Sequence, residues 1–354
     1  MFRILDRYVV RTFIGSYALC FFFFVGLFLI VDFFNQIDDF LEARDTIREA
    51  GASVTASVAS YYLYSIPFIF QQLAPFITVM AGLFTVTRLL KTNELYPMVH
   101  AGVSLYRVLS PLIFLSFLLT GAMLFAQEVL IPSLTWKRQE FARLCDGLDP
   151  SLIDEIETIT DVHGDRVRIG SFDPEANRIH DLDVTRFRDR AELRAEIADF
   201  RGDRWVLDAG IPRDFEDPSA PLPIEREWIT NITPADIRLA TEDKSSLSFL
   251  QILETYRRHP ERSELLTMMH RKLTFPLANV ILLLLGCWAI LRRRAQTAFF
   301  GISLCIVLCA LFFATDFVAQ ALGARGTLHP ILAAWLPVTL FGSLGITLFT
   351  GVRT

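Results

Sequence analysis

Residues 12–31 read TFIGSYALCFFFFVGLFLIV, an uninterrupted run without a charged side chain. The hydrocarbon core of a bilayer is about 30 Å thick, and an α-helix needs about 20 apolar residues to cross it. The run therefore predicts a membrane-spanning helix. Its apolar part is too long for a secretory signal, and acidic residues follow it in place of a small-residue cleavage site, so we expect the span to be retained.

Five further charge-free runs follow, at residues 50–87, 108–127, 273–291, 295–315 and 326–352. The first of these is longer than one span needs, and its small, polar-leaning beginning places the start of the span near Tyr62. We therefore predict six membrane helices, three on each side of a polar block. The composition agrees, because 52% of the 354 residues are hydrophobic and 31 are phenylalanine, more than an ordinary soluble domain carries.

Arginine and lysine residues near the ends of the spans predict the orientation. With the N-terminus in the cytoplasm, the cytoplasmic segments hold Arg3, Arg7, Arg11, Arg88, Lys91, Arg107, Arg292, Arg293, Arg294 and Arg353. The short outer segments hold only Arg44, Arg48 and Arg325. We therefore expect both termini in the cytoplasm and the polar block outside it.

Short alternating runs separated by turn signals fill residues 160–232. Such runs predict strands of a small all-β sandwich or jelly roll. Alternation places these side chains on the inward face: Val167, Ile169, Val184, Ile197 and Trp205. Two interpretations stay open, because the interior could pass acyl chains or could be packed solid while the domain docks a neighbour by strand addition.

The predicted fold is an integral membrane α-helical protein, with six transmembrane helices (3 + 3) and an inserted extracytoplasmic all-β, jellyroll-like domain. Residues 1–134 hold spans one to three, and residues 135–245 hold the β domain. Residues 246–354 hold a connector helix, expected near 247–259, and spans four to six.

No catalytic or nucleotide-binding motif appears in the sequence. On a strand, HDLD at 180–183 puts His180 and Leu182 on one face and the two aspartates on the other, so we expect no metal site. The chain lacks G-x-x-x-x-G-K-[ST], so an ion gradient or a separate ATPase would supply energy. Proton coupling has little support, because Asp316 is the only ionisable residue near a span interior, and we interpret it as an interfacial charge that faces water. The net charge of −5 does not suit a nucleic-acid binder.

Residues 91–104, KTNELYPMVHAGVS, form a polar segment between the second and third runs. Thr92 or Asn93 can cap a short helix here, Glu94 falls in its first turn, and Gly102 ends it. A separate ATPase would need such a docking feature on the cytoplasmic side. The alternative is that Glu94 is a simple helix cap.

Four stretches in register resemble the LptF/LptG (YjgP/YjgQ) family of lipopolysaccharide-export permeases. Residues 91–104 resemble the family's coupling-helix motif S-E-L-x-x-M-x-x-A-G-x-S, which is matched by Asn93 (in place of Ser), Glu94, Leu95, Met98, Ala101, Gly102 and Ser104. EVLIPSL at 128–134, HRKLTFPLANVILLLLG at 270–286 and LHPILAAWLPVTLF at 328–341 are similar to later family motifs. The resemblance extends over essentially the whole chain.

The resemblance implies a permease subunit, not itself an enzyme, of an ABC-type lipid exporter in a bacterial inner membrane. A separate ATPase dimer would use the ATP, so we expect no directly bound cofactor and no metal. The subunit would pair with a second copy or a homologue, extract lipopolysaccharide or a related lipid, and pass it to periplasmic jellyroll proteins like LptC and LptA. The residues that would couple to the ATPase are Asn93, Glu94, Leu95, Met98, Ala101 and Gly102. Among them, Glu94 would meet a basic residue of the ATPase.

In this interpretation two permeases enclose a lipid cavity, whose expected lining includes Phe22, Phe24, Phe28, Phe33 and Phe312. The alternative is that these side chains only face bilayer lipid. The chain departs from the family at Val99, where many members carry Arg, and at 31–43, VDFFNQIDDFLEA, which lacks the basic residues expected beside lipid phosphates. The cargo is then a different lipid, or the charge partner comes from the other permease.

Two other functions stay open at this point. One is a membrane scaffold whose outer domain binds a periplasmic partner without any ATPase. The other is a membrane enzyme acting on lipid headgroups, which would need convergent acid–base residues at the outer surface that the sequence does not offer.

Overall fold

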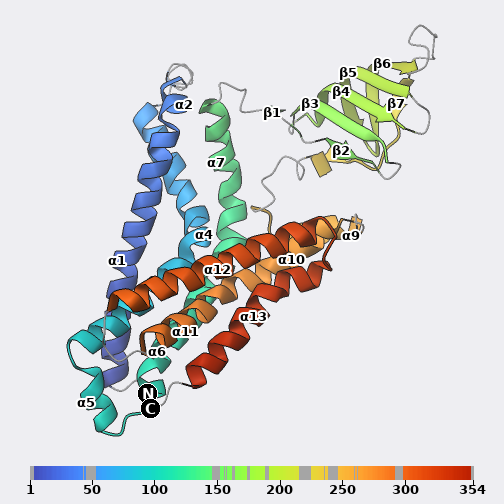
Figure 1. The fold of residues 1–354 in the computed structure, drawn as a ribbon. Helices are drawn as coiled ribbons and strands as arrows, with labels where there is room; N and C mark the ends of the chain where they lie inside the picture. The colour runs from blue at the N-terminus through green and yellow to red at the C-terminus, as the bar shows by residue number, and fades with distance from the viewer. Residues whose placement is uncertain are drawn as a thin grey trace. The chain divides into compact units, whose positions relative to one another are not determined.

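The computed structural model describes residues 4–42, 44, 53–145, 152–154, 156, 158–161, 164–173, 176–187, 191–214, 225–234, 236–237, 246–258, 260, 262–291 and 298–351. The chain forms two compact units (Figure 1). We call Met1–Gln36, Tyr62–Leu134 and Ser248–Thr354 the membrane unit. We call Ile37–Tyr61 and Thr135–Leu247 the β unit.

Six helical stretches in the described residues are long and apolar enough to cross a membrane, which confirms the predicted number of spans. They cover Ile4–Asn35, Val54–Lys91, Leu105–Thr135, Ser263–Leu291, Ile302–Ala324 and Pro330–Thr350. The second helix begins eight residues before the predicted start at Tyr62, and the division between the two units falls at that residue.

The spans are built from the following elements: α1 (Ile4–Asn35), α4 (Val54–Lys91), α6 (Leu105–Phe125), the π-helical turn η1 (Ala126–Leu130), α7 (Ile131–Cys145), α10 (Ser263–Thr274), the 3₁₀ turn η2 (Phe275–Leu277), α11 (Ala278–Leu291), α12 (Ala298–Ala324) and α13 (Pro330–Thr350). Shorter helices are α2 (Ile37–Glu42), α5 (Leu95–His100) and α9 (Phe249–Arg258). The helix expected near 247–259 is α9.

Two other helices approach span four closely at Gly286, which has no side chain to keep them apart. A Cβ atom added at Gly286 would lie 2.9 Å from Cγ2 of Val79 in α4 and 3.3 Å from Sγ of Cys305 in α12. Close approach through small residues is a common way for membrane helices to gain dispersion contacts. The result is one continuous apolar cluster, to which α1, α4, α6, α11, α12 and α13 all contribute.

The described strands of the β unit form one antiparallel sheet. They are β1 (Ile153–Asp154), β2 (Ile159–Thr160), β3 (Arg166–Asp173), β4 (Arg178–Arg186), β5 (Ala191–Arg201), β6 (Arg204–Asp214) and β7 (Glu225–Trp228). Their order is β1-β3-β4-β5-β6-β7, with β2 also paired to β3. Strands β3 to β7 are therefore neighbours in sequence order. The predicted all-β domain is confirmed, whereas the crossovers of a jelly roll are not formed by the described strands.

The strands lose their simple alternation at one level of the sheet. Asp181 in β4 has φ +58°, and its Cβ would lie 2.7 Å from a Cβ added at the opposite Gly170. In each of β3, β4 and β5, two buried residues stand three positions apart across this level: Ile169 and Phe172, Ile179 and Leu182, and Ala195 and Ala198. Beyond this kink, the side chains that point inward are shifted by one position. A simple alternation counted through the kink therefore assigns the wrong residues to the inward face.

The kink corrects one of the inward predictions. Val167, Ile169, Val184 and Trp205 are buried in the core of the β unit, at 0–3% exposure. Ile197 is half-buried and is not among the residues of that core, because Ala198 takes the inward position in its place.

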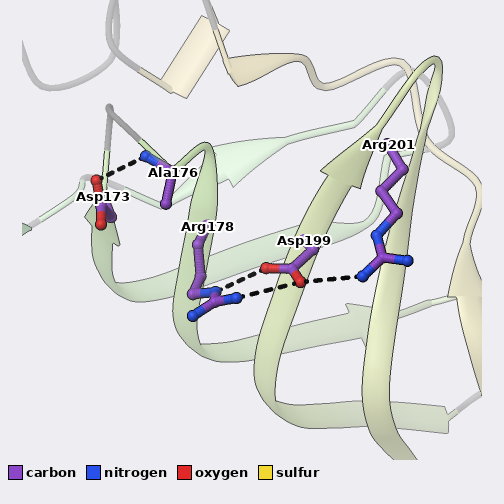
Figure 2. Close-up of polar contacts among 5 residues, drawn as sticks. All are labelled: Asp173, Ala176, Arg178, Asp199 and Arg201. Atoms are coloured by element: carbon purple, nitrogen blue, oxygen red, sulfur yellow. Dashed lines mark hydrogen bonds and ion pairs between the residues drawn. The ribbon is translucent and has the colours of Figure 1, made fainter.

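Charged side chains pair across strands β4 and β5, as Figure 2 shows. Asp199 of β5 lies directly opposite Arg178 of β4 and accepts hydrogen bonds from its Nε at 2.7 Å and its second guanidinium nitrogen at 3.3 Å. Arg201 adds a contact of 3.6 Å to the same carboxylate. Asp173 closes the preceding turn by accepting the N–H of Ala176 at 3.0 Å.

Candidate functional site

The segment between spans two and three folds into the short helix α5, as predicted. Gly102, with φ +82°, terminates it. The N–H of Gly102 donates to the carbonyl of Val99 at 3.0 Å, and that of Val103 donates to Met98 at 3.1 Å. This pair of bonds is a Schellman motif, in which a left-handed residue closes the last helical turn. Gly102 is therefore the helix stop for a conformational reason.

The start of α5 differs from the prediction. Glu94 occupies the N-cap position itself, with φ −83° and ψ −32°, and makes no side-chain capping bond. The Thr92 hydroxyl donates at 2.9 Å to the carbonyl of Arg88, in the last turn of α4. Asn93 takes the left-handed conformation at φ +55°, which asparagine tolerates better than most residues. Thr92 and Asn93 therefore end one helix rather than capping the next.

The six residues expected to couple to an ATPase divide by burial. Leu95 is 5% exposed and belongs to the core of the membrane unit, and Met98 packs against that core. Glu94 is half-buried, and its carboxylate lies against the hydroxyl of Tyr8 in α1. The exposed members are Asn93, Ala101 and Gly102. Leu95 and Met98 therefore anchor α5, while the exposed residues present a surface.

Polar contacts join three spans at the same end of the membrane unit as α5. Arg107, in the first turn of α6, pairs with Asp6 of α1 at 2.9 Å. The hydroxyl of Tyr106 donates at 3.0 Å to the carbonyl of Thr350, at the end of α13. Tyr8, beside Glu94, also belongs to α1. The surroundings of α5 are thus tied to spans one, three and six.

A second polar region lies where span four is broken. Pro276 has no N–H, so the carbonyl of Lys272 has no helical partner. The side-chain amide of Gln127 donates to that carbonyl at 3.3 Å, and the Gln127 oxygen accepts a bond of 2.6 Å from Gln71. Gln127 lies in the π turn of span three and Gln71 in α4. Three spans therefore meet around the one carbonyl that Pro276 leaves without a backbone donor, at a site made of two irregular helical turns.

Asn279 and Thr120 donate hydrogen bonds to a second carbonyl at the break in span four, that of Pro276. The amide of Asn279 and the hydroxyl of Thr120 donate to the carbonyl of Pro276 at 3.0 and 3.1 Å. The hydroxyl of Thr78 in turn donates to Asn279 at 2.9 Å. Asn279 and Thr78 are both fully buried. In hydrocarbon polar side chains must find partners inside the protein, and these three find them in one another and in the carbonyl of Pro276, which also accepts the N–H of Ala278.

Asp316 does not face water, which corrects the sequence interpretation. It is 6% exposed, and its carboxylate accepts bonds from Arg271 at 3.2 Å and Gln320 at 2.6 Å. The guanidinium of Arg271 also lies 4.8 Å above the ring of Phe275. The pair joins spans four and five. Asp316 is thus an ion-pair member between helices, and the guanidinium that neutralises it reduces the cost of burying the carboxylate.

The phenylalanines expected to line a lipid cavity lie in different environments. Phe22 and Phe33 are exposed, at 74% and 37%. Phe24 and Phe28 are half-buried against the core. Phe312 is 1% exposed and packs edge-on against Phe341 with ring centroids 5.4 Å apart. Within the single chain, Phe312 therefore lies in the core and not on an open surface.

The outward face of the β unit carries a hollow of about 530 Å³, lined by Arg168, Gly170, Asp181, Leu182, Asp183, Arg194, Ala195, Glu196, Asp208 and Ile211. Burial and the neighbouring Glu192 raise the pKa of Asp183 above its ordinary value, and Arg194 opposes them. Among the described residues there is no group of three His, Cys, Asp or Glu side chains that could hold a metal ion. The hollow is lined by side chains of both charges.

Comparison with known proteins gives one result that covers nearly the whole chain. The family described as "Lipopolysaccharide export system permease LptF/LptG" matches residues 7–351. No individual curated protein matches the chain.

Proposed function

The chain belongs to the LptF/LptG family of lipopolysaccharide export system permeases, and on this basis we propose that it is the permease subunit of an ABC-type exporter. It takes lipopolysaccharide or a related lipid from the inner membrane and passes it to a periplasmic bridge of jellyroll proteins. The ATP is used by a separate ATPase dimer. The membership itself carries a transport role, since the family consists of permeases.

The observation that supports coupling to an ATPase is the construction of α5. Its apolar residues, Leu95 and Met98, hold it on the core, while Asn93, Ala101 and Gly102 stay exposed. A helix anchored in this way can be pushed as a rigid body by a partner. The ties to α1, α6 and α13 give such a push a route into several spans. In this proposal Glu94 meets a basic residue of the ATPase.

The orientation belongs to the same proposal. The end of the membrane unit that carries α5 is cytoplasmic, together with both termini, and the β unit is periplasmic. The arginine and lysine bias of the sequence supports this. Of the residues counted in it, six lie outside the described residues: Arg3, Arg48, Arg292, Arg293, Arg294 and Arg353.

The second permease, a further copy or a homologue, is placed against α1 in this proposal. Only 11% of the apolar stretch of α1 is buried within the chain. Phe22 and Phe33 are exposed on it and would contribute to a shared lipid cavity. A cavity for acyl chains needs no polar lining, so exposed phenylalanines suit it.

The apolar side chains inside the β unit are packed against one another. This packing affects which route lipid could take past the unit. Val167 and Trp205 are fully buried, and the Trp205 indole N–H donates to the carbonyl of Ile232 at 2.8 Å. A path for acyl chains between these residues requires the interior to open. Docking of a neighbour by strand addition requires no such change. We therefore place strand addition first for this unit.

The test of coupling is Glu94→Lys in proteoliposomes that contain the permease and its ATPase. We expect normal insertion but ATP-driven lipid release lowered about tenfold or more, the effect of losing about 1.4 kcal/mol of interaction. Tyr8→Phe is the matched control, because it removes the hydroxyl beside Glu94 and leaves the carboxylate for the ATPase. Full release from a well-inserted Glu94→Lys protein would refute the coupling role. A scaffold function instead predicts that no ATPase co-purifies.

A further inference from the structure

The β unit consists of two chain segments, and the larger one is residues 135–247. The chain connects this segment to the membrane unit at both of its ends, and we call these two connections its attachments. Span three runs through η1 into α7 and leaves the membrane unit at Leu134. The chain returns at Ser248, directly before α9. How firmly these two attachments are joined decides whether a movement of span three is transmitted through one of them or through both.

Glu128 connects the two attachments on the membrane-unit side of each, just before α7 and at the start of α9. It lies in η1, and its two carboxylate oxygens accept the backbone N–H of Phe249 at 2.9 and 3.1 Å. The two residues are separated by 121 positions in the chain. Phe249 is the first residue of α9, where unpaired N–H groups and the helix dipole favour a carboxylate.

Two other N–H groups at the start of α9, those of Ser248 and Gln251, are paired by a capping box. Ser248 accepts the N–H of Gln251 at 3.2 Å, and Gln251 accepts the N–H of Ser248 at 2.7 Å. The reciprocal pair fixes the first turn locally. The capping box does not use the N–H of Phe249. Glu128, which belongs to span three, accepts that N–H.

The π turn and Lys272 explain why Glu128 can serve here. The π turn widens span three at Gln127 and Glu128, which contact span four and α9 respectively. Such turns are rare and are often found at functional sites. Lys272, 9% exposed, lies close enough to act electrostatically on Glu128. Its positive charge offsets that of the half-buried carboxylate.

We propose that Glu128 is a positioning residue that clamps the two attachments of residues 135–247 together. A displacement of span three is then carried into the β unit by α7 and α9 at once. Without this contact, α9 need not move together with span three. The displacement then reaches the β unit through α7 alone. The role in delivery rests on the proposed export function, whereas the clamp itself does not.

The experiment compares Glu128→Ala with Glu128→Gln and Lys272→Met in the full-length permease with its ATPase, reconstituted in lipid nanodiscs. Spin labels are placed on exposed Ser133 and Leu250, in a background without native cysteines, and their distance distribution is measured by electron paramagnetic resonance. We expect a narrow distribution in the wild type and a broadened one in Glu128→Ala. Glu128→Gln keeps an acceptor for Phe249, so its distribution should stay narrow. Lys272→Met removes the offsetting charge, but the Glu128 side chain still offers an acceptor oxygen whether or not it is charged, so this distribution should also stay narrow.

Lipid delivery to an acceptor protein and ATP hydrolysis are measured on the same variants in proteoliposomes. We expect Glu128→Ala to keep hydrolysis while delivery falls severalfold, with rescue by Glu128→Gln. An unchanged distribution in Glu128→Ala overturns the clamp, and broadening with full delivery overturns its role in transmission. Equal loss in Glu128→Gln and Glu128→Ala also overturns it, since the acceptor would not matter. A wild type that releases no lipid with ATP counts against the proposed function, while the distances still decide the clamp.

Discussion

Replacing Gln127 with leucine should destabilise the membrane unit. The loss of stability should be larger with proline at position 276 than with a residue that has a backbone N–H. The Gln127 side chain is 4% exposed and makes two contacts between spans, one from Gln71 at 2.6 Å and one to the carbonyl of Lys272 at 3.3 Å. Leucine has a similar volume, so the change removes polar contacts without leaving a large cavity. The carbonyl of Lys272 is then left without a donor, because Pro276 has none to give.

The magnitude follows from the number of lost bonds. Hydrogen bonds between membrane helices average about 0.6 kcal/mol, with a maximum near 1.7 kcal/mol, so two of them predict a loss of about 1–3 kcal/mol. In a Pro276→Ala background the new backbone N–H can serve the Lys272 carbonyl. We then expect the cost of Gln127→Leu to shrink by roughly one bond, about 0.6 kcal/mol. The contact with Gln71 accounts for the remainder.

The assay is reversible unfolding of the purified chain in mixed detergent micelles, with all four members of the Gln127/Pro276 double-mutant cycle. The reasoning is refuted if Gln127→Leu leaves the free energy of unfolding unchanged. It is also refuted if the cost is the same with proline and with alanine at position 276, since the unpaired carbonyl would then contribute nothing.

Two further predictions concern the β unit. Hydrogen bonding from Arg178 holds the pKa of Asp199 below its ordinary 3.8, against the opposing effect of burial. The pair therefore stabilises the fold above that pH and loses its effect as pH falls through the lowered pKa, so Asp199→Asn should cost about 0.2–1 kcal/mol at pH 7 and nothing in strong acid. Chemical denaturation at both pH values checks this, and a difference that persists in acid contradicts it. For the orientation, a cysteine in the 201–203 turn, in a background without native cysteines, should react with an impermeant thiol reagent on spheroplasts. A cysteine at Asn93 should stay protected, and the reverse labelling would invert the topology.

Several features could be predicted from the sequence because they depend on local chemistry. The free energy of moving a segment into hydrocarbon depends on its own side chains, so charge-free runs identified all six spans. Gly102 could be placed as a helix stop because a left-handed residue at that point is a local requirement. Alternating apolar residues gave the antiparallel β domain, since the period of a strand does not depend on its neighbours.

The local rules failed where they assumed an undisturbed element. Alternation placed Ile197 inward, but the kink at Asp181 and Gly170 shifts the inward position to Ala198. The pattern before α5 looked like a helix cap, but Thr92 bonds backwards to α4. In both cases a neighbouring strand or helix decided the conformation.

The partners of the polar side chains were decided only by the tertiary structure. Asp316 looked like an interfacial charge until helix packing placed Arg271 beside it, 45 residues away in sequence. Glu128 reaches Phe249 across 121 residues, and Phe312 is buried because α13 covers it with Phe341. The hydropathy of a segment fixes that it crosses the membrane, but all sides of an apolar helix are nearly equivalent in this respect. Which side meets which helix is set by the mutual packing of the six spans, and that packing assigns the pairs.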